Sequence, residues 1–422
     1  MRDALFEDAR RIVEGLLNDR ALVPDNQAPR PHETIHPGRP LQVRTLFGPI
    51  TLKRNYHHHR KAKTGYAPLD HSLDLTRKTT PALARLICRA SSQSGSYYQA
   101  AEDLQAYTGL TLDSRRFDRL IGDLAPGLGQ ARSTLPPETP APGQSPPAIL
   151  YASCDGTGIP FRKQELVGRP GKQPDGGAKT REAKLGCIFT QTTTDENGEP
   201  IRDPASTSYI GTMGGCREIG TLLHEEALRR GHGRIPQTVY LGDGAPWIWE
   251  NARLNFPGAV QILDFYHAAE HLGTLAGAIE GPGSKKAQTQ QTRWVKKLKK
   301  STIKPILTSV RRLLKNRIGG MTPEQLETVR REIAYFETNA RRTRYGDFRE
   351  RGYFIGSGVI EAGCKTVVGR RMKQSGMFWG ESGAEALLGV RCQILGPRFE
   401  EAWQARKPIL TAQRRKALQW TN

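Results

Sequence analysis

Long apolar runs are missing from this chain of 422 residues. No stretch approaches the roughly 18 consecutive apolar residues that a membrane-spanning helix needs. The first eight residues also lack the apolar core of a signal peptide. Hydrophobic residues still make up 37% of the chain, which is enough for a core. We therefore expect a cytoplasmic protein of several domains with no membrane partner.

Paired cysteines are missing as well. The six cysteines are widely and unevenly spaced, and no two of them form a C-x-x-C pair. This argues against a zinc ribbon and against a disulfide framework, so we expect reduced thiols. The chain also lacks the spacing G-x-x-x-x-G-K-[ST], so Gly356-Ser357-Gly358 is not expected to bind the phosphates of ATP.

Acidic residues are too few to balance the basic ones. The chain has 63 Lys and Arg against 42 Asp and Glu, which gives a formal net charge of +21. Such a chain usually binds a polyanion, because contacts with phosphates release counterions and supply affinity. An anionic membrane is the competing partner, and the absence of long apolar runs makes a nucleic acid the better expectation.

The N-terminal region, residues 1–76, predicts one helix and one hairpin. Residues 2–18 have apolar residues on one helical face. Alternating residues over 41–54 predict a β-hairpin that turns at Gly48-Pro49. Residues 57–59 are three consecutive histidines, and a metal site is one alternative for this stretch. Neighbours in sequence seldom point at one ion, so a basic loop is favoured.

Residues 77–125 predict a helical, helix-turn-helix-like DNA-binding region. One helix is expected around 97–104, a turn over 108–112 and a second helix that is capped by Ser114. Other short helical hairpins have the same pattern, so this prediction depends on the charge of the second helix. The candidate DNA contacts there are Arg115, Arg116 and Arg119.

A proline-rich stretch, residues 126–147, predicts an extended linker between domains. The region 148–280 then changes to strands, and three of its apolar runs lead into Asp155, Asp243 and Asp264. Strands with acids at their carboxyl ends, alternating with helices, are typical of an α/β sheet. We expect a sheet of the ribonuclease H type.

The region 281–350 predicts an all-helical, very basic segment. From 285 to 317 the chain carries twelve Lys or Arg and no acid. A solvated helical face is the alternative, but this imbalance favours contact with backbone phosphates. Residues 351–422 are expected to complete the core with a helix that carries Glu361, followed by C-terminal helices. The candidate DNA contacts of these two regions are Lys296, Lys297, Lys299, Lys300, Arg311, Arg312, Lys365, Arg370, Arg371 and Lys373.

Three carboxylates are candidate metal ligands and catalytic residues: Asp155, Asp243 and Glu361. Two aspartates at adjacent strand ends and a glutamate from a helix form a set of oxygen ligands suited to Mg²⁺, with Mn²⁺ as an alternative. Two such ions about 4 Å apart activate an attacking oxygen and stabilise a leaving oxygen in phosphoryl transfer. Each aspartate alone is as well explained as a turn residue, and the basic chain around them favours the catalytic role.

A rival motif is His267-Ala268-Ala269-Glu270-His271, which matches H-x-x-E-H, a zinc protease pattern. Two histidines at positions i and i+4 share a helix face and suit zinc. This pattern is short and leaves the charge of the chain unexplained. The alternative is that Asp264 and His267 line the carboxylate site as accessory residues.

Four stretches together resemble bacterial insertion-sequence transposases of the ISKra type. They begin at Ser153, Leu241, Asp264 and Ile355, and they read SCDGTGIP, LGDGAPWIW, DFYHAAEH and IGSGVIEAGCK. Met372-Lys-Gln-Ser-Gly-Met-Phe-Trp379 and Arg391 also fit, and the resemblance covers residues from about 40 to about 403.

This resemblance implies a DDE transposase with a ribonuclease H-like core and an all-helical insertion. It assigns Asp155, Asp243 and Glu361 as the triad and Asp264 with His267 as an accessory pair. It also implies double-stranded DNA as partner, a homodimer or higher oligomer on DNA, and a bacterial, nucleoid-associated location. Relatives often carry a cysteine-containing, zinc-binding stretch after the first hairpin; here it reads HHHRKAKTG from His57, so no structural zinc is expected.

The alternative function is a catalytically inactive or domesticated transposase that acts as a DNA-binding protein. It would keep the basic regions and the fold. The presence of all three candidate carboxylates favours the active enzyme over this alternative.

Overall fold

The computed structural model describes residues 2–61, 63–139, 143, 145–171, 173–174, 176–315 and 317–419. The chain forms two compact units, and both are discontinuous in sequence. One division between them, after Leu135, falls within the predicted linker 126–147, whereas none lies near the expected boundaries at residues 76, 280 and 350. Unit 1 consists of residues 1–135, 160–180 and 367–422, and unit 2 consists of residues 136–159 and 181–366.

Unit 1 begins with the expected helix and hairpin, although the hairpin is longer than predicted. Strands β1 (Glu33–Thr45), β2 (Gly48–His59) and β3 (Thr64–Tyr66) form an antiparallel sheet in that order. Our prediction of a turn at Gly48-Pro49 was wrong. These two residues pair with Thr45 and Arg44, so the turn lies at Leu46-Phe47.

Helix α1 (Arg2–Asn18) confirms the predicted N-terminal helix. Val13 and Leu17 pack against the apolar cluster of the hairpin. Leu5 and Ile12, which we expected on the same face, remain 63% and 62% exposed. The predicted apolar face is therefore wider than the surface that the hairpin covers.

The three histidines do not form a loop, so that prediction was wrong. His57, His58 and His59 end strand β2 and pair with both neighbouring strands. His57 is fully buried and its Nδ1 lies 3.2 Å from a carboxylate oxygen of Glu33. Burial of one ring between two strands separates it from its neighbours, as the alternation of side chains along a strand requires.

The helix-turn-helix pattern is present as two helices of unit 1. Helices α4 (Tyr97–Thr108) and α5 (Ser114–Thr134) are joined by a short connection that starts with Gly109 in a left-handed conformation. The cap of α5 is Asp113, which accepts the backbone N–H of Arg115, and not Ser114 as predicted. Helices α2 (Pro68–Ser72) and α3 (Pro81–Gln93) precede this pair.

Helix α5 corrects the predicted linker. We expected residues 126–147 to be extended, but α5 continues through Pro126 to Thr134. Leu128 and Ala131 are buried, and α15 (Glu381–Ile394) and α16 (Phe399–Gln419) pack against this helix. Tertiary burial of one face outweighs the cost of a proline inside the helix.

Trp379 precedes these C-terminal helices and belongs to the core of unit 1, as predicted. It is 7% exposed, and its ring N–H donates to the carbonyl of Met372 at 3.0 Å. Helix α14 (Arg370–Met372) lies in the same stretch. Buried indole rings usually find such a hydrogen-bond acceptor.

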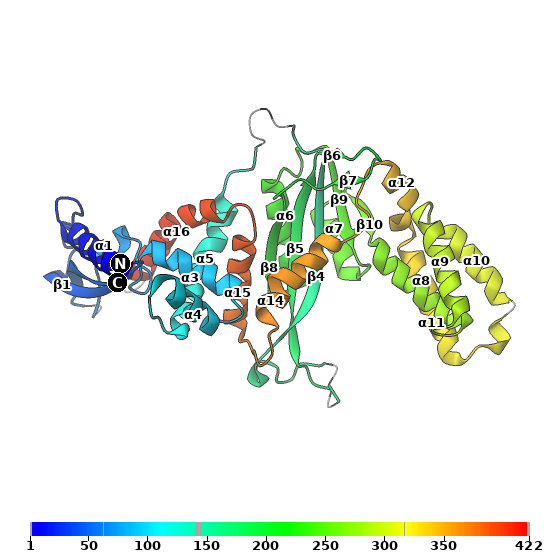
Figure 1. Cartoon of the computed structure of the whole chain (residues 1–422), viewed down its shortest axis with the longest axis horizontal. Coiled ribbons are helices and arrows are strands. Elements are labelled where there is room, and N and C mark those ends of the chain that lie inside the picture. The colour runs from blue at the N-terminus through cyan, green and yellow to red at the C-terminus, as the bar shows by residue number, and fades with distance from the viewer. Residues whose placement is uncertain are drawn as a thin grey trace. The chain divides into compact units, whose positions relative to one another are not determined.

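Unit 2 is built on a five-stranded sheet with both parallel and antiparallel pairs, which confirms an α/β architecture (Figure 1). Its strand order is β10-β9-β4-β5-β8. Strand β9 pairs in parallel with both β4 and β10, whereas β5 and β8 are antiparallel. The strands are β4 (Ile149–Pro160), β5 (Thr180–Gln191), β8 (Ser208–Thr212), β9 (Gln237–Gly242) and β10 (Val260–Leu263).

The strand predictions for this sheet are confirmed, with one correction at β4. This strand does not end at Asp155, because it continues to Pro160. Its parallel pairing with β9 stops at Ser153, so Asp155 lies just beyond the last paired residue. A short hairpin of β6 (Thr193–Thr194) and β7 (Pro200–Ile201) follows β5 in the chain.

Helices alternate with the later strands of unit 2. Helix α6 (Cys216–Arg229) buries Ile219, Leu223 and Ala227, which are spaced at four residues and so share one face. Helix α7 (Pro246–Asn255) follows β9, and α8 (Phe265–Glu280) follows β10.

The region 281–350 is helical, as predicted. Its helices are α9 (Lys285–Lys299), α10 (Lys304–Lys315), α11 (Pro323–Thr338) and α12 (Tyr345–Glu350). Helix α11 begins with a capping box of Thr322 and Gln325. Helices α9 and α11 pack against α8 (Figure 1). Within the described part of the chain, no helix combines the length and apolar character needed to cross a membrane.

Candidate carboxylate site

Three aspartates lie side by side at one edge of the sheet of unit 2. Ser153 of β4 pairs with Leu241 of β9, so Asp155 and Asp243 each follow two residues later on neighbouring strands. Leu263 of β10 pairs with Gly242, and the backbone N–H of Asp264 donates to the carbonyl of Gly242 at 2.7 Å. Because these three strands are parallel, their carboxyl ends meet at the same edge.

Glu361 reaches the same unit from helix α13 (Gly358–Gly363), which continues into a π-helical segment, Cys364–Gly369. The chain before α13 is held at the start of α8. The carbonyl of Ile355 accepts the N–H of Phe265 at 2.9 Å, and the N–H of Ser357 donates to the carboxylate of Asp264. These two bonds place the first turn of α13 beside Asp264.

Two glycines permit this close approach. A methyl group at Gly356 would lie 2.9 Å from the ring of Tyr266, and one at Gly363 would lie 2.7 Å from the ring of Tyr209. Both distances are too short for a real contact. Close packing therefore requires glycine at Gly356 and Gly363, which explains the glycine on each side of Glu361.

Ser357 precedes α13 but does not cap the helix with its side chain. Its hydroxyl donates to an oxygen of Glu361 at 3.1 Å, and the residue is 4% exposed. Nδ1 of His267 lies 4.0 Å from the same carboxylate oxygen. Glu361 is thus oriented by Ser357 and lies near a ring that carries charge.

Asp264 and His267 form a pre-organised pair. Asp264 is fully buried, and one of its oxygens accepts the backbone N–H of His267 at 2.7 Å and lies 3.1 Å from the Nδ1 atom of its ring. Burial alone would raise the pKa of Asp264, but the hydrogen bonds from His267 and Ser357 outweigh it and lower that pKa. The same hydrogen bond raises the pKa of His267 to about 9, so its ring is protonated at neutral pH.

Asp155 is in the opposite situation. Burial raises its pKa first of all, and the nearby charge of Asp243 raises it further. One oxygen accepts the backbone N–H of Gly156 at 2.6 Å, and the other accepts the thiol of Cys364 at 3.5 Å. Cys364 lies one turn after Glu361, so this contact links the helix of Glu361 to Asp155.

Asp243 accepts hydrogen bonds through both its side chain and its backbone carbonyl. Its side chain accepts the N–H of Ala245 at 2.9 Å, and its carbonyl accepts the hydroxyl of Tyr335 from α11 at 2.8 Å. Gly244 has φ of +108°, and a methyl group there would lie 2.6 Å from the ring of Tyr335. The aromatic ring therefore packs against the turn that carries the carboxylate.

The two histidines of the H-x-x-E-H motif are bound by different partners. His271 stacks on Tyr335 with ring centroids 3.7 Å apart, and its Nδ1 lies 2.5 Å from the buried carboxylate of Glu332. His267 instead faces Asp264. Nothing in this arrangement directs both rings at one zinc ion, and His271 is better described as a support for Tyr335.

Two sets of side chains can be compared as ligands for a cation. Among the described residues, ligand atoms of Asp264, His267 and Glu361 lie within 4.8 Å of one another. In that set, however, both oxygens of Asp264 already accept hydrogen bonds, and His267 carries a proton. Asp155, Asp243 and Glu361 offer only carboxylate oxygens, the donor type that hard divalent cations prefer. Among the described residues, however, these three do not form such a close cluster.

Sequence reasoning missed several side chains near the carboxylates. Lys184, in the apolar strand β5, is 6% exposed and its Nζ lies 4.4 Å from the ring centroid of Trp247. It also pairs with Glu182, which lies against Gly156. A lysine directly before the apolar run Leu185-Gly-Cys-Ile-Phe189 was the available signal. No comparable signal existed for Tyr335 or Cys364.

The candidate DNA contacts of unit 1 differ in exposure. Arg115, Arg119, Arg370 and Lys373 are exposed, and Arg116 is partly buried. Arg371 is 1% exposed, donates to the carbonyl of Ser91 at 2.8 Å and lies over the rings of Tyr97 and Trp379. Assigning Arg371 to DNA was wrong, because a side chain enclosed by the core cannot reach a phosphate.

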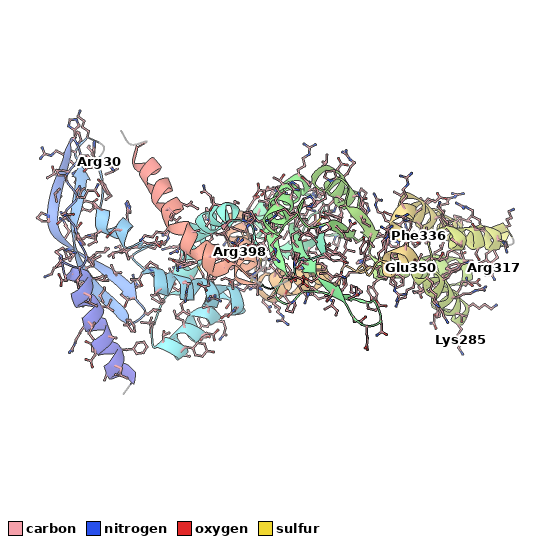
Figure 2. The ribbon with its side chains drawn as sticks, turned by 90° about the horizontal axis from the view of Figure 1, so that it is seen from above. Arg30, Lys285, Arg317, Phe336, Glu350 and Arg398 are labelled. Carbon is pink, nitrogen blue, oxygen red and sulfur yellow. The ribbon has the colours of Figure 1, made fainter. Side chains whose placement is uncertain are left out.

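The candidate DNA contacts of unit 2 are all exposed. Lys296, Lys297, Lys299 and Lys300 lie in or just after α9, Arg311 and Arg312 lie in α10, and Lys365 follows α13. Arg311 pairs with Glu337 of α11. Figure 2 labels Lys285 and Arg317, the two ends of the basic run. Arg317 pairs with Glu280, so an acid outside the run balances part of its charge.

Compared with models of known protein families and with curated proteins, the chain matches neither a family model nor a curated protein.

Proposed function

We propose that the chain is a DDE transposase that cleaves DNA strands at the ends of an insertion sequence and transfers them into target DNA. The observation that carries this proposal is that Asp155 and Asp243 follow neighbouring parallel strands, while Glu361 lies in the same unit, one turn before Cys364, whose thiol contacts Asp155. The three carboxylates are 88 and 118 positions apart in the chain (243 − 155 and 361 − 243). We infer that the five-stranded sheet is a ribonuclease H-like core and that residues 281–350 are its helical insertion.

The oxygen donors support Mg²⁺ as cofactor, with Mn²⁺ as an alternative. Burial first of all, and then the nearby charge of Asp243, raises the pKa of Asp155, so the charged form of this carboxylate is disfavoured. A bound cation favours the charged form, and Asp155, Asp243 and Glu361 are the residues that would hold such an ion. When bound, divalent ions supply activation of the attacking oxygen and stabilisation of the leaving oxygen.

The protein side chains position the reacting strand ends. In the proposed reaction, water attacks a phosphodiester at the element end, and the freed 3′-hydroxyl then attacks a phosphodiester of target DNA. Asp264 and His267 orient Glu361, and Tyr335 orients Asp243. The exposed lysines of α9 and the arginines of α5 supply backbone contacts whose affinity falls with salt.

The inactive, DNA-binding alternative predicts the same basic surfaces but no chemistry. A zinc protease finds no support in the geometry, because His267 and His271 each face their own carboxylate. No observation favours either alternative over the transposase.

The test is a cleavage and strand-transfer reaction with purified full-length protein, Mg²⁺ and the DNA that flanks its gene. We expect products from the wild type and none from Asp155→Asn, Asp243→Asn or Glu361→Gln, while DNA binding stays within about tenfold. Glu327→Gln, on the exposed face of α11, is the matched control and should remain active. Full activity of Glu361→Gln would overturn the assignment, and metal-independent binding without any products would favour the inactive alternative.

A further inference from the structure

A tight turn of unit 1 carries two cationic residues in a backbone conformation that residues with side chains rarely adopt. Thr76 and Thr79 exchange backbone hydrogen bonds at 2.9 and 3.1 Å, so Arg77 and Lys78 are the two central residues. Both have positive φ, 49° and 59°. Positive φ at both positions marks a type I′ turn, which strongly prefers Asn-Gly. Arg-Lys is a poor choice for this backbone.

The strain in this turn is considerable. A left-handed conformation costs roughly 1–2 kcal/mol for each residue with a side chain. Among the described residues, six non-glycine residues have positive φ, and three of them are Asp74, Arg77 and Lys78. Such strain persists only where surrounding contacts determine the backbone, and it concentrates at functional positions.

The surrounding contacts that hold the turn come from three elements of unit 1. The buried carboxylate of Asp74 pairs with Arg406 of α16 at 2.6 Å. The N–H of Arg44 in β1 donates to the carbonyl of Lys78 at 2.9 Å. The guanidinium of Arg116 in α5 donates to the carbonyl of Arg77 at 3.0 Å. The turn is therefore fixed against helix α5.

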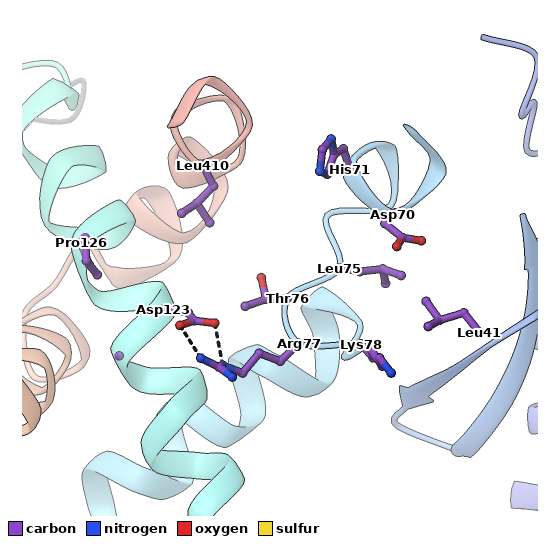
Figure 3. A pocket seen from close by; sticks show the side chains of 11 residues that line it. Leu41, Asp70, His71, Leu75, Thr76, Arg77, Lys78, Asp123, Pro126 and Leu410 are labelled. Carbon is purple, nitrogen blue, oxygen red and sulfur yellow. Dashed lines mark hydrogen bonds and ion pairs between the residues drawn. The ribbon is translucent and has the colours of Figure 1, made fainter. Parts of the chain in front are cut away.

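The side-chain contacts of the turn do not offset its strain. Arg77 makes a bidentate pair with Asp123 of α5, at 2.7 and 3.0 Å, on the wall of a cavity of about 510 Å³ (Figure 3). Both side chains are about 40% exposed, and such a pair contributes about 0–1 kcal/mol. Lys78 is exposed and its ammonium has no partner in the part of the chain that the structure describes.

The neighbourhood of the turn gathers further positive charge. Burial lowers the pKa of Arg116, and the charges of Arg44 and Arg77 lower it further. Arg119, one turn later on the exposed face of α5, acts in the same direction. An anion brought to this surface would meet cations from β1, the turn and α5, all within unit 1.

We propose that Arg77 and Lys78 form a binding site for the phosphodiester backbone of duplex DNA, continuous with the arginines of α5. This proposal rests on the proposed function, because it takes DNA as the partner. It extends the DNA contacts to a turn whose backbone is held in a strained conformation so that two cations lie beside the helix. Planar guanidinium and ammonium groups both bind phosphate oxygens without reading base sequence.

Two double variants separate the charge of the turn from its backbone. R77N/K78G removes both charges and supplies the residues that a type I′ turn prefers. R77Q/K78Q removes both charges and keeps the strain. R39Q/K53Q removes two exposed charges from the hairpin of the same unit and is the matched control.

The readout is binding of the full chain to a labelled DNA duplex in EDTA, with Asp155→Asn in every protein to prevent cleavage. We expect both turn variants to lower the dependence of log affinity on log salt by about 2, because each lost phosphate contact lowers it by about 1. Between about 50 and 200 mM salt, the parent then loses roughly tenfold more affinity than either variant. R77N/K78G should melt no lower than the parent, and R39Q/K53Q should bind like it.

Parent-like affinity and salt dependence in R77Q/K78Q would overturn the site, as would a melting temperature of R77N/K78G below that of R77Q/K78Q. Binding of the parent to vesicles of anionic phospholipid, but not to DNA, would also overturn it and would remove the proposed function. Strand cleavage by the wild type together with unchanged DNA binding by both turn variants would remove this inference alone.

Discussion

The two halves of the carboxylate site differ in how their charge is balanced. The accessory half, Asp264 with His267, is neutralised within the protein, because a protonated ring and two backbone N–H groups satisfy the buried carboxylate. The cation-ready half, Asp155 with Asp243, has only one backbone N–H and a thiol for Asp155, and its two charges repel each other. The accessory half stabilises and positions the site, whereas the negative charge of the cation-ready half favours binding of a cation.

This contrast predicts opposite effects of the same chemical change. Removing a charge from the cation-ready half should relieve repulsion at the expense of function. Removing a charge from the accessory half should break a satisfied network. Substitutions in the two halves should therefore differ in their effect on stability as well as on activity.

The largest effect is expected for Asp155→Asn. Strand cleavage should fall below detection, because a metal ligand is lost. In EDTA, this variant should melt above the wild type, since repulsion between Asp155 and Asp243 is gone. Addition of Mg²⁺ should raise the melting temperature of the wild type only. Thermal melting with and without Mg²⁺ measures both outcomes, and a destabilised Asp155→Asn protein would contradict the contrast.

A smaller loss of activity and a clear loss of stability are expected for Asp264→Asn. The amide cannot accept the N–H groups of His267 and Ser357 as the carboxylate does, and a protonated ring is left facing a neutral group. We expect the free energy of unfolding to fall by about 1–3 kcal/mol, the cost of leaving a buried polar group without its hydrogen-bond partner. Urea unfolding in EDTA checks this value. An Asp264→Asn protein as stable as the wild type would mean that the accessory half is not pre-organised.

Tyr335→Phe tests whether the helical region positions the cation-ready half. It removes only the hydroxyl that binds the carbonyl of Asp243 and leaves the stacking on His271 intact. We expect about tenfold slower cleavage, the effect of about 1.4 kcal/mol, together with weaker Mg²⁺ binding and nearly unchanged DNA affinity. Tyr353→Phe, whose hydroxyl bonds Gln237 away from the site, is the control. Equal rates and metal affinities in both variants would deny Tyr335 this positioning role.

The smallest effect concerns the pH dependence of stability without metal. The pKa of His267 is about 9 in the folded chain and near its ordinary value of 6.5 when unfolded. Its contribution is therefore fully present below pH 6.5 and is lost as the pH rises through 9. The ring is partly exposed, so we expect a modest decline of the melting temperature over this range in EDTA. His267→Asn should lack this decline, and an identical pH profile would contradict the assigned charge of the ring.

The sequence already contained the main elements of the sheet and the candidate carboxylates. Apolar runs predicted strands β4, β9 and β10, and the acids after these runs indicated Asp155, Asp243 and Asp264. These are local signals, since a strand that is covered on both faces reads as a continuous apolar run. The capping box at Thr322 is a local feature of the same kind, because its hydrogen bonds join residues three positions apart.

Errors arose where distant parts of the chain decide the local structure. Pro126 and its neighbours suggest a linker, but packing against α15 and α16 keeps them helical. Arg371 suggests a phosphate contact, but aromatic rings enclose it. The histidines at 57–59 suggest a basic loop, but strands on both sides pair with them. In each case, tertiary burial outweighs local preference.

The sequence by itself determined which carboxylates are the candidates for a site, because acids, glycines and apolar runs are recognisable over a few positions. Only the tertiary structure decided how their charges are balanced. Strand register places Asp155, Asp243 and Asp264 along one edge, and the bond between Ser357 and Asp264 places Glu361 beside them. Register and burial depend on contacts between residues far apart in the chain, so the distinction between a neutralised half and a cation-ready half has no signature in the order of the amino acids.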